Sequence, residues 1–155
     1  IGRAKSVELV AAFQLGERLA LEKLDRNKIE GPECVYRLMA PQMQPLQKES
    51  LRAILLNTRH HVIKIEQISL GSINESIAHP REIFQPALVH SAYGIIVVHN
   101  HPSGDPAPSE ADLRLTRRLA EAGSLLQVPL LDHVIVGLPH PSRASYYSFK
   151  EAGVL

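Results

Sequence analysis

The chain has 155 residues, 45% of them hydrophobic and 21% charged, which is typical of one soluble globular domain with its own core. The formal net charge of +1 lacks the basic excess of a nucleic-acid-binding domain, and no apolar run approaches the ~20 residues of a membrane helix. The single cysteine, Cys34, excludes an intrachain disulfide and a multi-cysteine zinc site, and it fits a reducing, cytoplasmic compartment.

The first part of the chain is predicted to be a helical appendage. Apolar residues recur at helical spacing over residues 5–24, and Gly31-Pro32 opens a second, short helix expected over 33–39. Two prolines bracket a linker, so we place a boundary that leaves residues 1–45 as the appendage and 46–155 as the main domain. The chain starts without a signal peptide and without an initiator Met, so we expect a piece of a longer protein.

The main domain alternates predicted strands and helices. Two neighbouring strands form a hairpin, and the later strands are separated by helices, one of which has Pro80 at its first position. This order indicates a mixed sheet of the α/β or α+β class, flanked by helices. The strands are expected over 51–56, 62–70, 94–98, 130–136 and, as an edge, 145–149, and the helices over 81–90 and 109–126.

The most informative stretch lies where the strand over 94–98 leads towards the helix over 109–126. Side chains alternate along a strand, so His99 and His101 project to the same side of the strand end. Asp112 lies in the first turn of the following helix, on the face predicted to pack inward. Two imidazoles and a carboxylate are three ligands, and a catalytic zinc takes three protein ligands with a fourth position open to water.

A capped turn is the simpler interpretation of these residues. Ser109-Glu110-Ala111-Asp112 is a capping pattern for any helix, and histidines at strand ends are often only polar termini. Each residue alone favours this structural interpretation, whereas the combination of strand, His-x-His, rigid loop and inward carboxylate favours a metal centre. Ser109 is suited to both roles, with its backbone opening the helix and its hydroxyl facing the site.

Three segments resemble known families. His99-x-His101, seven residues, Ser109, two residues and Asp112 is the spacing of the JAMM (MPN+) zinc metalloproteases. The whole string from His99 to Asp112, together with residues 80–84 and 131–137, is similar to the bacterial RadC family. The resemblance implies a JAMM/MPN-like layered sheet, as in cytidine deaminases, around one Zn²⁺ ion. It also implies a zinc-dependent metallopeptidase or an isopeptidase-type amide hydrolase.

The resemblance also assigns roles to residues. It implies that His99, His101 and Asp112 bind the zinc, and that the Ser109 hydroxyl stabilises the oxyanion of the tetrahedral intermediate. Metal-bound histidines usually donate their other N–H to an acceptor, so Asp132-His133 is a candidate pair behind the ligands. A satisfied core histidine is an equally good interpretation of His133.

A JAMM site further requires a glutamate from an earlier strand as general acid and base. Glu49 fits by resemblance, because it stands just before the strand over 51–56. The structural alternative for Glu49 is a solvated charge at a strand start. Glu66, in the middle of a strand, and Glu82, in the first turn of a helix, are the competing candidates.

The chain start suggests a second class of function. Residues 1–5, Ile-Gly-Arg-Ala-Lys, resemble the tail of a helix-hairpin-helix, a phosphate-backbone binder that RadC proteins carry before the JAMM domain. The alternative is therefore a DNA-associated repair or recombination protein, with DNA bound through the missing N-terminal part and the JAMM domain in support. Metal-assisted nuclease chemistry is a third hypothesis, although no second ligand set is found. A protein or peptide substrate and no membrane partner are expected.

Overall fold

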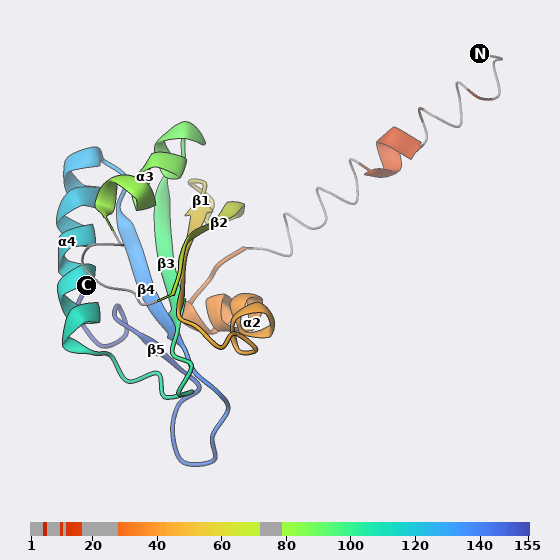
Figure 1. Cartoon of the computed structure of the whole chain (residues 1–155). Helices are drawn as coiled ribbons and strands as arrows, with labels where there is room; N and C mark the ends of the chain where they lie inside the picture. The colour runs from red at the N-terminus through yellow and green to blue at the C-terminus, as the bar shows by residue number, and fades with distance from the viewer. Residues whose placement is uncertain (1–4, 6–9, 11, 17–27, 72–78) are drawn as a thin grey trace.

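The computed structural model describes residues 5, 10, 12–16, 28–71 and 79–155, which a five-stranded sheet organises. The strands are β1 (Ser50–Leu56), β2 (Val62–Leu70), β3 (Gly94–Asn100), β4 (Leu130–Val136) and β5 (Tyr146–Ser148), and the helices are α2 (Pro32–Met43), α3 (Pro80–Val89) and α4 (Glu110–Leu126). The strand order is β2-β1-β3-β4-β5 (Figure 1). Only β3 and β4 pair in parallel, because α4 connects them, whereas the other neighbours are antiparallel.

These elements confirm the predicted mixed sheet flanked by helices, including the hairpin and the helix that starts at Pro80. Two elements continue past their predicted C-terminal ends by two residues or more. The strand β3 continues through His99 to Asn100, because hydrogen bonding to β1 and β4 extends past the apolar run. Helix α2 starts at Pro32 and ends at Met43 rather than at Met39.

The sheet is covered on both faces, by α3 and α4 on one side and by α2 on the other (Figure 1). Alternation along the strands divides the core accordingly. Leu51 and Val97 pack on the α3/α4 side, whereas Ile54 and Val98 pack on the α2 side. His99 has the parity of Val97, so its side chain lies on the α3/α4 side of the sheet.

Helix α2 belongs to the core of the sheet. Its residues Val35, Met39 and Met43 are fully buried and share a hydrophobic cluster with strand residues such as Ile96. The described residues 29–43 thus pack on the sheet, although they precede the boundary expected near residue 45.

Two of the features predicted from the sequence lie in parts of the chain that the structure does not describe. Most of the helix expected over 5–24 and residues 1–4 of the proposed hairpin tail lie outside the described residues. Within the described part of the chain, no helix combines the length and the apolar character needed to cross a membrane.

Candidate metal centre

Three predicted ligand side chains converge at the end of β3. The Nε2 atoms of His99 and His101 are 3.0 Å apart, and Asp112 places Oδ1 3.3 Å from the first and Oδ2 3.5 Å from the second. Bonds of ~2.1 Å at tetrahedral angles separate zinc ligands by ~3.4 Å, so the spacing suits one ion. Among the described residues this is the group of histidine, cysteine and acidic side chains that meets a metal-binding geometry.

The sheet and α4 bring these side chains together. His99 pairs with Leu51 of β1 on one side and Ile135 of β4 on the other, and it is only 1% exposed. Asp112 lies on the buried face of α4, as the helical periodicity predicts, and is 5% exposed. His101 follows the strand, and its backbone N–H donates to the carbonyl of Val136 at 3.3 Å.

The loop after His101 fixes the orientation of that imidazole. Its Nδ1 donates to the carbonyl of Asp105 at 2.7 Å, so in the neutral ring Nε2 carries the lone pair. The Asp105 carboxylate shapes the turn, since its Oδ1 accepts the N–H of Ala107 at 3.0 Å. A Cβ on Gly137 would lie 2.7 Å from the carbonyl oxygen of Gly104, so glycine lets the β4–β5 turn pack closely on this loop.

Ser109 and Asp112 form a complete capping box at the start of α4. The Asp112 N–H donates to Oγ of Ser109 at 3.2 Å, and the Ser109 N–H and hydroxyl donate to Oδ2 of Asp112 at 2.8 and 2.6 Å. The capping pattern and the metal motif are therefore compatible, because the cap orients the carboxylate that faces the histidines.

Charges in the site favour a bound cation. Burial opposes ionisation of Asp112, but its contacts with the imidazoles of His101 and His99 lower the pKa of this carboxyl well below its usual range. The hydrogen bond to Asp112 raises the pKa of His101, against the effect of burial. Two imidazole nitrogens and an ionised carboxylate facing one another form a donor set that fits Zn²⁺.

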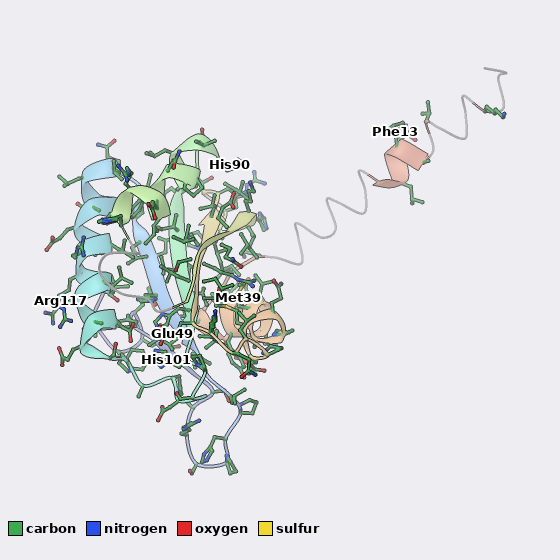
Figure 2. All side chains as sticks on the ribbon, viewed as in Figure 1. Phe13, Met39, Glu49, His90, His101 and Arg117 are labelled. Atoms are coloured by element: carbon green, nitrogen blue, oxygen red, sulfur yellow. The ribbon has the colours of Figure 1, made fainter. Side chains whose placement is uncertain are left out.

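Glu49 stands directly before β1, at the end of the sheet where His101 lies (Figure 2). The charge of Glu49 is one of the influences that raise the pKa of His101, after those of Asp112 and Asp105. Its backbone is held on both sides by Asn100, whose Oδ1 accepts the Ser50 N–H at 2.9 Å and whose Nδ2 donates to the Lys48 carbonyl at 3.3 Å. Sequence reasoning missed Asn100, since its only signal is a polar residue between the two histidines.

The competing glutamates lie elsewhere. Glu66 sits opposite Ala53 in the middle of β2 and pairs with Lys64 at 2.5 Å. Glu82 is exposed in the first turn of α3. Both line a groove between β2 and α3 rather than the end of β3.

Asp132 and His133 point to opposite sides of β4. Nε2 of His133 is 2.8 Å from Nδ1 of His99. The Asp132 carboxylate instead accepts from the Ser148 hydroxyl at 2.6 Å and the Lys150 N–H at 3.0 Å, and burial raises its pKa. The structure adds Thr116, whose Oγ1 is 2.7 Å from Nδ1 of His133.

Comparison with known proteins places this geometry in context. A family model described as "RadC-like JAB domain" matches residues 29–154. Among similar proteins are three named "UPF0758 protein", from Alkaliphilus metalliredigens (strain QYMF), Moorella thermoacetica (strain ATCC 39073 / JCM 9320) and Methanosarcina mazei (strain ATCC BAA-159 / DSM 3647 / Goe1 / Go1 / JCM 11833 / OCM 88). They are 47%, 49% and 43% identical to this chain and align with 100%, 100% and 99% of it. The chain spans 65%, 66% and 65% of their lengths, just under two thirds.

Proposed function

The chain belongs to the RadC family through its RadC-like JAB domain, and from this membership and the site geometry we propose a zinc-dependent hydrolase of amide bonds. The observation that carries the proposal is the convergence of His99, His101 and Asp112 within 3.5 Å of one another. Peptides or isopeptide-linked proteins are the proposed substrates. Because the chain spans less than two thirds of its relatives, the activity of the whole protein is part of this proposal.

In this proposal His99, His101 and Asp112 hold the zinc. When bound, zinc lowers the pKa of a coordinated water to ~7 and polarises a carbonyl group. The chain's own contribution is a rigid frame, because β3, the loop after His101 and the α4 cap each fix one ligand. Such a frame positions reacting groups without further reorganisation.

Glu49 is the proposed general acid and base. Its carboxylate accepts a proton from the attacking water and then delivers that proton to the nitrogen of the leaving amine, which breaks the amide bond. A role of this kind contributes ~10²–10⁴ in rate. The position of Glu49 next to the pinned start of β1 and its electrostatic influence on His101 support this assignment.

Ser109 is the proposed donor to the developing oxyanion. In the structure its hydroxyl donates to Asp112 at 2.6 Å, so this role requires the hydroxyl proton to turn from the carboxylate to the substrate oxygen. The Ser109 N–H keeps its own bond to Asp112 at 2.8 Å, so the carboxylate stays oriented when the hydroxyl turns.

The decisive test pairs metal analysis with a hydrolysis assay on quenched peptide and isopeptide libraries. We expect about one zinc per wild-type chain, and Glu49→Gln should keep the metal while losing ~10²–10⁴ in rate. Glu66→Gln is the matched control, because Glu66 lies in the middle of β2, and it should retain both zinc and activity. A purified protein that takes up no zinc would end the proposal.

The alternative function is DNA binding. It rests on residues 1–5, of which 1–4 lie outside the described residues, and the formal net charge of +1 gives it no support.

A further inference from the structure

A fully buried histidine stands behind the proposed zinc ligands. His133 has no exposed surface, and its ring stacks on Phe149 with centroids 4.6 Å apart and an interplanar angle of 8°. Its two nitrogens are both engaged, Nε2 with Nδ1 of His99 at 2.8 Å and Nδ1 with Oγ1 of Thr116 at 2.7 Å. His133 therefore links β4 to both β3 and α4 through polar atoms.

The hydrogen positions along this chain of contacts follow from the acceptors at its end. Oγ1 of Thr116 lies 2.7 Å from the backbone carbonyl of Asp112, which only accepts, so the single hydroxyl hydrogen goes to that carbonyl. Oγ1 can then only accept from His133, so the proton of His133 sits on Nδ1. In the neutral ring Nε2 is left as an acceptor, and it receives the Nδ1 hydrogen of His99.

The ring of His133 is neutral for a physical reason. His133 is completely buried and lies against the Phe149 ring, and an environment without water disfavours the charged imidazolium. A neutral His133 with its proton on Nδ1 leaves the lone pair of His99 on Nε2, the atom that faces His101 and Asp112.

We propose that Thr116 and His133 are positioning residues that fix the tautomer and ring orientation of His99, so that its Nε2 presents a lone pair to a metal ion. The proposal deepens the proposed function and rests on its zinc site. A histidine kept only for packing needs no defined tautomer, whereas this relay starts at the carbonyl of one ligand, Asp112, and ends at another, His99. Removing a residue that hydrogen-bonds to a ligand histidine typically lowers metal affinity by about 10- to 100-fold.

The first test reads the tautomers directly. Long-range ¹H–¹⁵N correlation spectra of the metal-free 155-residue chain, at alkaline pH, distinguish a proton on Nδ1 from one on Nε2. We expect both His99 and His133 to carry it on Nδ1. A His133 ring protonated on Nε2 overturns the proposal, whatever the metal affinity.

The second test measures Zn²⁺ affinity by competition with a chelator. Thr116→Val removes the acceptor for His133 and should mix the His99 tautomers and weaken zinc binding about 10- to 100-fold, while Thr116→Ser restores the hydroxyl and the affinity. Thr58→Val, at an exposed turn, is the matched control and should change neither. His133→Phe keeps an aromatic ring against Phe149 but removes both nitrogens, so it decides the question if Thr116→Val does not fold.

The outcomes separate this proposal from the function it rests on. Unchanged tautomers and unchanged zinc affinity in Thr116→Val and His133→Phe overturn the relay while the zinc site stands. A wild-type protein that binds no zinc ends the proposed function, and the spectra then decide the relay alone: loss of the Nδ1 tautomer of His99 in Thr116→Val supports it.

Discussion

At the scale of single residues, protons and a metal ion compete for the same side chains of the proposed site. His101 shares the Asp112 carboxylate with His99, and its Nδ1 is held by the carbonyl of Asp105. The hydrogen bond to Asp112 raises the pKa of His101, so the metal-free site retains a proton at a pH where a free imidazole has lost it. A metal ion has to displace that proton.

This competition predicts how zinc binding depends on pH. As the pH falls through the raised pKa of His101, the apparent zinc affinity should drop by about tenfold per pH unit, because one proton is released on binding. The stability of the metal-free protein has the opposite pH dependence. Because the pKa of His101 is raised in the folded state, this residue contributes stability at low pH, and that contribution is lost as the pH rises through the raised pKa. The rise in Tm that zinc produces should therefore grow with pH.

Thermal denaturation with and without zinc across a pH series checks this prediction. His101→Ala should abolish the pH-dependent part of the increment, whereas His140→Ala, at an exposed residue outside the ligand group, should leave it intact. An increment in Tm that stays constant with pH in the wild type would contradict the prediction.

At the scale of elements, the N-terminus of α4 is both a helix cap and a ligand holder. Ser109 makes three hydrogen bonds with Asp112, and through them the carboxylate is held over the buried face of the sheet. Thr116 and Leu119, on the same face, are fully buried. Helix stability and ligand geometry thus depend on the same serine.

Ser109→Ala should consequently lower two quantities together. Loss of the cap should reduce the free energy of unfolding of the metal-free protein by ~1 kcal/mol, and the less restrained Asp112 should weaken zinc binding. Urea denaturation and a zinc titration measure the two effects. Ser124→Ala, at an exposed position within α4, is the control and should cost neither stability nor affinity. Unchanged zinc binding in Ser109→Ala would limit the serine to helix capping.

At the scale of the whole molecule, the site depends on the join between the start of β1 and the end of β3. Regular pairing of these strands ends at Leu51 and His99. The Asn100 side chain continues the connection by binding the residues on either side of Glu49, at 2.9 and 3.3 Å. Asn100 is only 2% exposed, so water does not readily take over its hydrogen bonds. Losing one of these bonds should therefore destabilise the folded protein.

Asn100→Asp should break one half of this join. The new carboxylate still accepts the Ser50 N–H, but its second oxygen faces the Lys48 carbonyl without a hydrogen, which should cost ~1–3 kcal/mol at neutral pH. Protonation supplies the missing hydrogen, so the folded-state pKa of the new carboxyl is raised. The stability deficit of the Asn100→Asp variant relative to wild type should shrink as the pH falls below that pKa.

Urea denaturation of metal-free protein at neutral and acidic pH provides the measurement. Asn57→Asp is the matched control: Oδ1 of Asn57 accepts from the N–H groups of Arg59 and His61, and a carboxylate keeps both bonds. A deficit in Asn100→Asp that is the same at both pH values would exclude this account of the join.

The sequence by itself determined the local parts of this protein. The side chains of His99 and His101 face the same ion-sized space because strand residues alternate, and Asp112 faces inward because α4 has one buried face. The capping box was also readable, since its partners are three residues apart. These features depend on the backbone geometry of a single element, which neighbouring residues specify.

Only the tertiary structure decided which distant residues support those ligands. Thr116 and His133 are 17 residues apart, and Asn100 and Ser50 are 50 apart, so their contacts depend on strand register and on where α4 packs. The same holds for α2, because the opening Gly31-Pro32 predicts a helix but not the face of the sheet that this helix covers. Local patterns name the ligands, whereas packing selects the residues that orient them, because burial and register are properties of the whole chain.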